Sequence, residues 1–376
     1  MKMNSSPEKL HREPADEEIR PLGAAALVRL GAIGVVMAVS AGGFAYAGGW
    51  FSLHELTQQS MVDTFQNVNG VHPGFRRNHA KGLCASGTFA SSGQGVRLSK
   101  AAVFAADATV PVIARFAIAG GRPYAADSMM SVRSLALRFV LPNGEEWRTG
   151  MNALPVFATN TPEAFWEQLV ASKPDPATGK PDPAKMQAFL VQHPETERAM
   201  ALIKAAPKTP GFSDSTFRSL NAFRFANESG TSVPVRWAVV PVQAATEEMT
   251  AAADDKNALF DALIKQSAHQ PLRWRLIVTV GKPGDPTADA TLPWPDGREQ
   301  VDVGTLTLSS VTDEDDGACT SVNYDPLVLP SGIEPSDDPL LSARSAAYSV
   351  SYTRRAGEAK QPSAVTADEV REVDGR

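Results

Sequence analysis

Two segments that lie far apart in the sequence carry residues suited to acid–base and metal chemistry. Residues 76–82 read Arg-Arg-Asn-His-Ala-Lys-Gly, with His79 at the centre. A histidine titrates near neutral pH, so it can take a proton from one oxygen of a peroxide and deliver it to the other. Residues 344–348 read Arg-Ser-Ala-Ala-Tyr. A tyrosine phenolate is an anionic iron ligand, which pushes electron density toward an O–O bond that is being cleaved.

Tyr348 can ligate a metal only as the phenolate, and a free tyrosine has a pKa of about 10. A nearby cation is therefore needed to lower that pKa. Arg344 stands four residues earlier, so on a helix it falls on the same side as Tyr348 and can donate a hydrogen bond to the phenolate oxygen. Tyr352, one turn later, has no arginine four residues before it. The spacing favours Tyr348 as the ligand over the simpler interpretation of a tyrosine packed in the core.

Both segments resemble motifs of the haem catalases. In that family R-x-x-H-A-K-G carries the distal histidine, and R-x-x-x-Y supplies the axial tyrosinate. Gly87-Thr88-Phe89 stands where the family has Gly-x-Phe. Arg355 follows Tyr348 at the spacing of a family arginine that reaches a haem propionate. A lone histidine is more often structural, but this context favours a catalytic role for His79.

The resemblance extends roughly over residues 56–355. It stops where typical catalases continue into a wrapping segment and a C-terminal helical domain. The chain is therefore identified as a member of the haem catalase superfamily, in the small catalase-related peroxidase branch. The resemblance implies haem b as the cofactor, because no CxxCH motif is present for covalent attachment.

The resemblance also implies a role for each matched residue. His79 and Asn152 are expected to act on the peroxide, while Tyr348 ligates the iron with the help of Arg344. Asn152 lies in a segment with one residue more than the family's G-N-N-T-P-V-F, and an ordinary loop asparagine is the alternative. The arginines expected to bind the haem propionates are Arg76, Arg115 and Arg355.

One residue departs sharply from the family pattern. Ala117 ends the sequence Arg-Phe-Ala, where the family has Arg-Phe-Ser and the serine hydroxyl binds the catalytic histidine. Alanine cannot hold an imidazole, so we expect a backbone carbonyl or a water to fix the tautomer of His79. The departure puts full catalase turnover in doubt more than peroxide cleavage. Residues 133–136, Arg-Ser-Leu-Ala, resemble the family's R-G-F-A, where Arg133 is expected to make a structural salt bridge.

Short apolar runs separated by turn residues must position these side chains. Such a series predicts an antiparallel barrel, so the expected fold class is α+β, a catalase-like antiparallel β-barrel with surrounding helices and one preceding transmembrane helix. The expected strands are residues 101–104, 110–117, 134–140, 223–225, 235–242, 274–280 and 303–308.

Helices are expected on either side of these strands. Residues 54–67 have weak amphipathic spacing, a second helix begins near Pro162, and residues 185–206 follow with several apolar packing positions. Between the last two, the sequence Lys-Pro-Asp-Pro-Ala occurs twice. This duplication is far shorter than a structural repeat and predicts a loop.

Residues 30–51 form an uncharged run about as long as a bilayer-spanning helix. The basic residues before it place the N-terminus in the cytoplasm and the remainder outside. We therefore expect a cytoplasmic tail at 1–23, a transmembrane anchor or signal segment at 24–51, a haem-binding peroxidase domain at 52–356 and a flexible tail at 357–376. The localisation expected is the inner membrane, single-pass, with the catalytic domain in the periplasm.

Two other interpretations of the apolar run stay open. Residues 45–47 read Ala-Tyr-Ala, which fits a signal-peptidase site and would release a soluble periplasmic protein. Against cleavage, the preceding region is long and holds as many acidic as basic residues. A buried core helix is the remaining alternative, although its many glycines make it a poor soluble helix.

Charge and cysteine content exclude some classes of partner and of metal site. The net charge of −6 gives no support for nucleic-acid binding, which would require a clustered excess of lysine and arginine. The only two cysteines, Cys84 and Cys319, are too few for a zinc or iron–sulfur site. They could form one disulfide in an oxidising compartment, but the sequence does not decide whether they lie close enough.

The function expected from the resemblance is a haem peroxidase that reduces hydrogen peroxide or organic hydroperoxides with a small organic electron donor, with weak catalase activity. One alternative is a haem-dependent fatty-acid hydroperoxide isomerase or dehydratase. Another is a non-enzymatic haem- or lipid-binding barrel, although a carrier would not need a distal base such as His79. A homo-oligomer is compatible with the sequence, which does not determine the oligomeric state.

Overall fold

The structure is a computed structural model that describes residues 23–47, 56–127, 132–243 and 256–367. The chain divides into two compact units, Met1–Glu55 and Leu56–Arg376. In the first unit, helix α1 covers Ala24–Ala47. It is long and apolar enough to cross a membrane, a property that it shares with N-terminal signal sequences. The expected tail at 1–22 and the end of the expected anchor at 48–51 lie outside the described residues.

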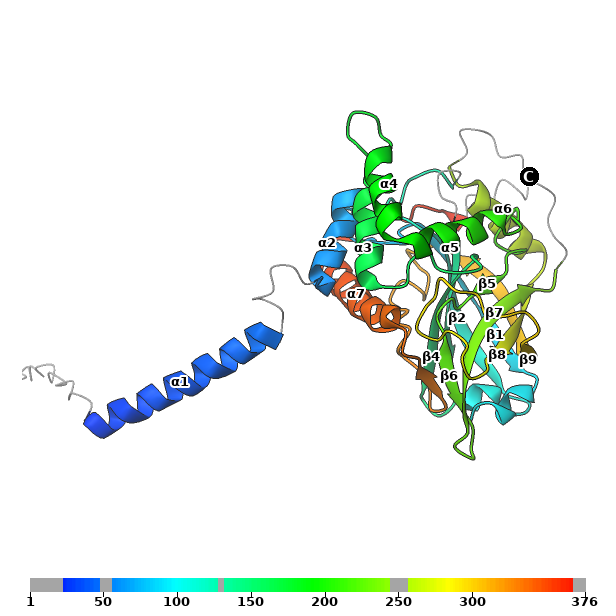
Figure 1. Cartoon of the computed structure of the whole chain (residues 1–376). Coiled ribbons are helices and arrows are strands. Elements are labelled where there is room, and N and C mark those ends of the chain that lie inside the picture. The colour runs from blue at the N-terminus through cyan, green and yellow to red at the C-terminus, as the bar shows by residue number, and fades with distance from the viewer. Residues whose placement is uncertain (1–22, 48–55, 128–131, 244–255, 368–376) are drawn as a thin grey trace, which may run out of the picture. The chain divides into compact units, whose positions relative to one another are not determined.

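The second unit is built around eight antiparallel strands that close into a barrel (Figure 1). The strands run in the order β7, β5, β4, β3, β2, β1, β9 and β8, and pairing of β8 with β7 closes the ring. Two short strands, β6 and β10, extend the sheet beside β7. The predicted α+β fold with an antiparallel barrel is thereby confirmed. The strands are β1 (Gly82–Ser91), β2 (Thr109–Ile118), β3 (Arg133–Val140), β4 (Glu146–Asn152), β5 (Phe217–Arg218), β6 (Phe223–Ala226), β7 (Ser232–Pro241), β8 (Leu272–Val280), β9 (Glu299–Thr312) and β10 (Ile333–Pro335).

Aromatic side chains fill the barrel interior. Trp147 stacks on Phe139 with ring centroids 4.7 Å apart, and it meets Trp237 edge-on at 5.1 Å. All three are buried, as are Trp274 and Phe116. Each such ring removes a large apolar area from water, and tilted or offset packing adds to the gain. Closure also leaves no open sheet edge among the barrel strands, so this core supports a rigid frame for the site.

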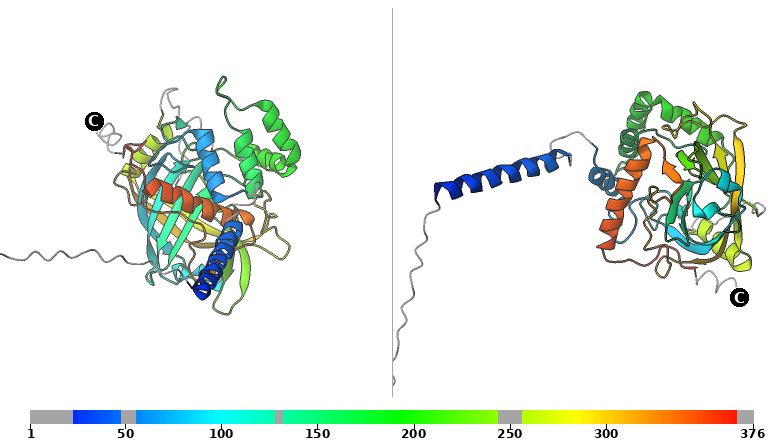
Figure 2. Two further views of the ribbon diagram at one scale, coloured as in Figure 1. Left: turned by 90° about the vertical axis from the view of Figure 1, so that its left-hand side faces the viewer. Right: turned by 90° about the horizontal axis from the view of Figure 1, so that it is seen from below.

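Helices gather on one flank of the barrel. Figure 1 shows α2, α3 and α7 together on one flank of the barrel, and in the left view of Figure 2, which faces that flank, α7 crosses in front of the strands. Contacts join α2 to α3 and to α7, and α3 to α4 and α7, whereas α6 packs on β9. The helices of this unit are α2 (Gln58–Asn69), α3 (Pro162–Ala171), α4 (Pro183–Gln192), α5 (Pro194–Ala205), α6 (Ala258–His269) and α7 (Pro339–Ala356), with 3₁₀ turns η1 (Gln94–Arg97) and η2 (Ala102–Phe104).

Local predictions failed at several places. Residues 101–104, expected as a strand, form the 3₁₀ turn η2, whose Val103 and Phe104 are buried. A short apolar run cannot by itself distinguish a strand from a buried turn. The single helix expected over 185–206 is divided into α4 and α5 at Pro194, because proline lacks the N–H that would continue the first helix. Four strands were not predicted: β1, β5, β10 and β4, whose residues alternate between buried and half-buried.

The segment after α7 corrects the expectation of a flexible tail for residues 357–367. Glu358 accepts hydrogen bonds from Arg77 and from the backbone N–H of Gly74. Val365 and Ala367 are buried in the core of this unit. The segment is therefore held by an ion pair and by apolar packing, and only residues 368–376 of the expected tail lie outside the described chain.

Candidate active site

The seven residues expected to carry the chemistry all line one cavity of about 350 Å³. The cavity lies where the loop before β1, one end of the paired strands β2, β3 and β4, and helix α7 meet. Sequence positions as distant as 76 and 355 are therefore brought together. The seven residues are Arg76, His79, Arg115, Asn152, Arg344, Tyr348 and Arg355.

His79 is held by its backbone and by its ring. Its φ is 53°, a left-handed conformation that costs energy for a residue with a Cβ. The side-chain oxygen of Asn78 accepts hydrogen bonds from the backbone N–H groups of His79 and Gly120, both at 2.9 Å, and so supports this conformation. The ring nitrogen Nδ1 lies 3.1 Å from the hydroxyl of Ser134.

The surroundings keep the imidazole neutral. Burial, followed by the positive charges of Arg115, Arg344 and Arg76, lowers the pKa of His79 to about 3. Both effects disfavour the imidazolium, since burial removes water and the guanidinium groups repel a further positive charge. At neutral pH one ring nitrogen therefore carries a lone pair that can accept a proton.

Ser134 takes the role that was expected of a carbonyl or a water. Its hydroxyl approaches Nδ1 of His79 and donates a 2.5 Å hydrogen bond to Oδ1 of Asn152. Ser134 lies directly opposite Ala117 on the neighbouring strand. The expectation drawn from Ala117 was therefore wrong in its cause: the hydroxyl is present, but it comes from β3. The register of β2 against β3, which could have revealed it, is not readable from either strand alone.

Helix α7 presents Arg344 and Tyr348 one turn apart on the same side. Asp338 caps the helix by accepting from the N–H of Leu340, and Pro339 occupies its first turn. The Arg344 guanidinium donates to the carbonyl of Gly150 at 3.2 Å and to the side chain of Asn221.

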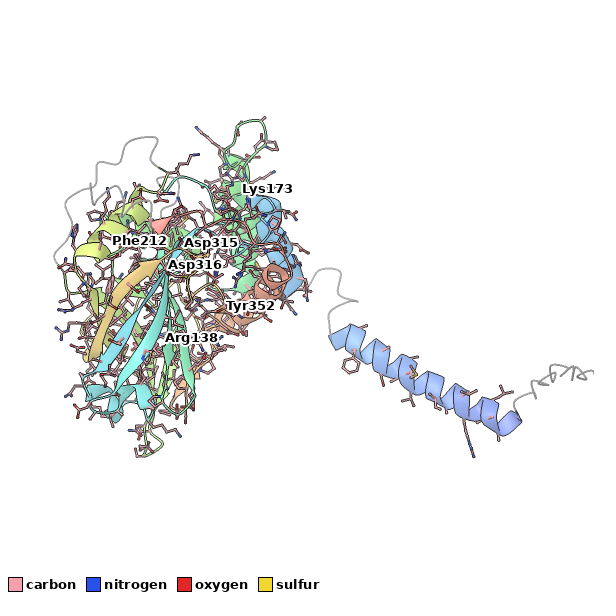
Figure 3. The ribbon with its side chains drawn as sticks, turned by 180° about the vertical axis from the view of Figure 1, so that it is seen from behind. Arg138, Lys173, Phe212, Asp315, Asp316 and Tyr352 are labelled. Carbon is pink, nitrogen blue, oxygen red and sulfur yellow. A yellow bond between two sulfur atoms is a disulfide. The ribbon has the colours of Figure 1, made fainter. Side chains whose placement is uncertain are left out.

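The two head groups of α7 meet above one residue of β4. The phenol oxygen of Tyr348 lies 3.6 Å from the point where a Cβ of Gly150 would stand, and Nη2 of Arg344 lies 3.4 Å from it. Tyr352, one turn further along α7 and labelled in Figure 3, also lines the cavity, but its ring packs 5.3 Å from the Arg355 guanidinium. Arg344 and the Tyr348 phenol thus both lie beside Gly150, whereas the cation beside Tyr352 is Arg355.

The three expected propionate arginines surround a carboxylate that the sequence did not indicate. Glu314 accepts from Nε and Nη2 of Arg115, both at 2.8 Å, and from Nη1 of Arg76 at 3.0 Å. It belongs to the acidic run 313–316, whose other members include Asp315 and Asp316, labelled in Figure 3 near the end of β9. Such a run is typical of a solvated loop, so the sequence gives no sign that Glu314 turns inward.

The charge of this cluster fits a haem. Three guanidinium groups and one carboxylate leave a net charge of +2, which two propionates would neutralise. Burial, followed by the charges of Arg115 and Arg355, lowers the pKa of Arg76 to about 9, so the cluster favours added negative charge. Nε of Arg355 is buried without a hydrogen-bond partner among the described residues. An unsatisfied buried donor of this kind calls for an acceptor.

A disulfide holds the loop that supports these arginines. Cys84 of β1 and Cys319 are bonded, with Cα atoms 5.3 Å apart, so the pairing left open by the sequence is made. Arg76 donates to the carbonyls of Cys319 and Val322, at 3.1 and 3.0 Å, in the loop after β9. Arg355 donates to Thr320 of the same loop at 2.6 Å.

Two further residues of the motifs have structural explanations. A Cβ on Gly82 would stand 2.3 Å from the Arg115 guanidinium, so only glycine leaves room for it. Arg133, expected in a salt bridge, donates to the carbonyl and hydroxyl of Thr209 at 2.6 and 3.0 Å. These contacts link β3 to the segment before β5, and the partners shown are neutral oxygens rather than a carboxylate.

Comparison with known proteins places this chain in a family. The catalase family model matches residues 50–370. A catalase-related peroxidase of Synechococcus elongatus is 38% identical over 327 residues, which cover 86% of this chain and 95% of that protein. A second, from Mycolicibacterium paratuberculosis, is 33% identical over 307 residues, covering 80% of this chain and 96% of the relative.

Solved structures show the same fold. A bacterial catalase matches with a TM-score of 0.66 at 20% identity, over 81% of this chain and 62% of its own. Catalase A from Saccharomyces cerevisiae matches with a TM-score of 0.65 at 20% identity, over 81% of this chain and 65% of its own. The chain thus spans a little under two thirds of the length of these catalases. From its sequence, its barrel and the family match over most of its length, the chain belongs to the catalase family.

Proposed function

We propose that this chain is a haem-dependent peroxidase that reduces hydrogen peroxide or organic hydroperoxides with a small organic electron donor. The observation that carries the proposal is the convergence of a neutral buried histidine, a tyrosine paired with an arginine, and a cationic cluster of net charge +2 around one cavity. The similarity to two proteins named catalase-related peroxidase supports the reaction class.

The cavity residues fit haem b, held without covalent attachment. Tyr348 would ligate the iron, with the Arg344 charge nearby to favour the phenolate. Arg76, Arg115 and Arg355 would receive the propionates, because the buried Nε of Arg355 still lacks an acceptor among the described residues. When bound, the haem supplies the iron at which the O–O bond of a peroxide is cleaved.

His79 and Asn152 act on the peroxide itself. The neutral imidazole would take a proton from one peroxide oxygen and deliver it to the other, which leaves as water or an alcohol. Asn152 has its carbonyl oxygen engaged by Ser134, so its NH₂ group is the part that can donate a hydrogen bond to the peroxide. Buried arginines around the histidine keep it in the base form before it takes up the proton, and they favour its return afterwards.

The test compares two tyrosines of α7 in the haem-loaded protein. Tyr348→Phe should remove the tyrosinate optical spectrum and the peroxide-dependent oxidation of a phenolic donor. Tyr352→Phe, one turn away on the same cavity, is the matched control and should keep both. A Tyr348→Phe protein with an unchanged spectrum would refute the ligand assignment, and His79→Ala with near-native turnover would refute the role of the base.

The same protein distinguishes the alternative functions. Conversion of a fatty-acid hydroperoxide without consumption of reductant would indicate an isomerase or dehydratase. Haem uptake with no turnover of any peroxide would indicate a carrier. Residual oxygen release from hydrogen peroxide alone would measure the catalase activity.

We also propose that α1 directs the catalytic unit out of the cytoplasm, as an inner-membrane anchor with that unit in the periplasm. The length and composition of α1 support the membrane step, although a cleaved signal sequence would look the same. The disulfide between Cys84 and Cys319 supports an oxidising compartment, since such bonds are rare in the cytosol.

A further inference from the structure

We infer that Ser134 is a positioning residue that fixes the tautomer of His79 and the amide orientation of Asn152 at the same time, through one hydrogen-bond relay. The relay runs from the Nδ1–H of His79 to the Ser134 hydroxyl, and from that hydroxyl to Oδ1 of Asn152. The inference rests on the proposed function, because it names the residue that orients His79, the proposed base.

The sheet register places the three components. Ala117 of β2 lies opposite Ser134 of β3, and Ser134 lies opposite Asn152 of β4. Directly opposite residues of antiparallel strands project from the same face of the sheet. All three line the cavity, so this row forms part of its wall, with the hydroxyl in the middle.

Counting protons determines the direction of the relay. A serine hydroxyl has one proton, and here it is donated to the Asn152 oxygen at 2.5 Å. The contact with His79 at 3.1 Å can then be a hydrogen bond only if Nδ1 carries the proton. The lone pair of the neutral ring is consequently on Nε2. Ser134 is 8% exposed, so little water can compete for these partners.

Backbone support of His79 does not depend on Ser134. The left-handed conformation at His79 is held by Asn78, which lies in the loop before β1. Removal of the Ser134 hydroxyl should therefore release the imidazole ring and the Asn152 amide while leaving the chain path intact. This separates a positioning role from a purely structural one.

The position of the hydroxyl explains why it is shared. Adjacent strands lie about 4.8 Å apart, so a hydroxyl at 117 would stand roughly 10 Å from residue 152 along the row. A serine at 117 could reach the histidine but not Asn152. At 134 the hydroxyl lies between them, and one side chain orders both groups that meet the peroxide.

The first experiment needs no substitution. The full chain is produced with ¹⁵N-labelled histidine and loaded with diamagnetic zinc protoporphyrin. The NMR signals of the His79 ring nitrogens are assigned as those that are missing from the spectrum of His79→Gln. We expect protonated Nδ1 and unprotonated Nε2. A ring protonated at Nε2 would overturn the inference, because the Ser134 proton would then point toward the histidine.

Ser134→Ala tests the relay in the haem-loaded enzyme. The ring should lose its single tautomer, and the rate of reaction with peroxide should fall by about 10–100-fold, as is common when the partner of a functional histidine is removed. The Tyr348-dependent optical spectrum should not change. Ser86→Ala removes a cross-strand hydroxyl from the exposed pair with Ser310 and is the matched control, expected to react at the wild-type rate.

Moving the hydroxyl across the strands separates its two functions. Ala117→Ser combined with Ser134→Ala should restore the single tautomer but not the coupling to Asn152. In the wild-type background, the effects of Ser134→Ala and Asn152→Ala on the rate of reaction with peroxide should be non-additive. In the Ala117→Ser, Ser134→Ala protein, Asn152→Ala should act independently of the moved hydroxyl. Full additivity, or an unchanged tautomer and rate in Ser134→Ala, would overturn the inference. Near-native turnover of His79→Ala would instead remove the proposed function and leave the tautomer result standing.

Discussion

At the scale of single residues, the site depends on charges that are buried together. His79 lies among three arginines, and its depressed pKa follows from burial first and from their charge second. Two of these arginines, Arg76 and Arg115, are also held by Glu314, so the base and the arginine cluster share one electrostatic environment. Two predictions follow from this arrangement, one for pH and one for the carboxylate.

His79 should make the haem-free protein sensitive to mild acid. Its folded-state pKa is about 3, against about 6.5 in an unfolded chain, so between these values the unfolded state binds more protons. Stability should therefore fall as the pH drops below 6.5. Between pH 7 and pH 5 the wild type should lose on the order of 1–2 kcal/mol more than His79→Gln, measured by urea unfolding. Equal losses in the two proteins would show that this histidine is not held neutral.

Glu314→Gln should raise the cluster charge from +2 to +3 without changing its shape. Breaking a buried ion pair leaves uncompensated charge, so the haem-free protein should lose about 3 kcal/mol of unfolding free energy. Haemin should bind more tightly, since more guanidinium donors become free for its propionates. The measurements are urea unfolding and haemin titration.

Glu299→Gln is the control for that experiment. Glu299 forms an ion pair with Arg97, and the two side chains are 55% and 49% exposed. Such surface pairs contribute less than about 1 kcal/mol to the free energy of unfolding. A Glu314→Gln protein as stable as this control would contradict the assigned role of the carboxylate.

At the scale of elements, the loop between β9 and β10 connects the disulfide to the arginine cluster. Cys319 and Thr320 lie in this loop, and their carbonyls accept from Arg76 and Arg355. The bond to Cys84 of β1 closes a sequence separation of 235 residues. The loop is therefore anchored to the barrel wall at the point where it supports the arginines.

Replacing both cysteines with alanine should loosen this loop. We expect a loss of about 2–4 kcal/mol in unfolding free energy and weaker haemin binding, because Arg76 and Arg355 lose fixed acceptors. Calorimetry and haemin titration measure the two effects. Weaker haemin binding by the wild type after reduction would agree, whereas unchanged affinity in the double variant would separate the disulfide from the site.

At the scale of the whole molecule, the proposed role of α1 is to direct the catalytic unit out of the cytoplasm. If it is an uncleaved anchor, the full-length chain should stay with the membrane pellet after an alkaline carbonate wash, and its mass should include residues 1–47. If it is a cleaved signal, the mature protein should be soluble and should begin at Gly48. Protein found in the cytosol with an intact N-terminus would contradict both.

Much of the architecture could be predicted from local pattern. The apolar run became α1, six of the seven expected strands were found, and the four-residue spacing of Arg344 and Tyr348 placed both on one face of α7. These features depend on residues that are close together in the sequence, so they can be predicted from hydrophobic periodicity and residue propensity. Local pattern failed at 101–104, where burial was recognised but backbone conformation was not.

The sequence by itself determined which side chains could do chemistry: a histidine base, a tyrosine ligand and three arginines, each within a short motif. Only the tertiary structure decided what supports them. Ser134 meets His79 through the register of adjacent strands, Glu314 turns inward from an acidic loop, and Cys319 reaches β1 across most of the chain. Such partners depend on strand register and barrel closure, which arise from packing the whole chain and leave no local signal in the residues concerned.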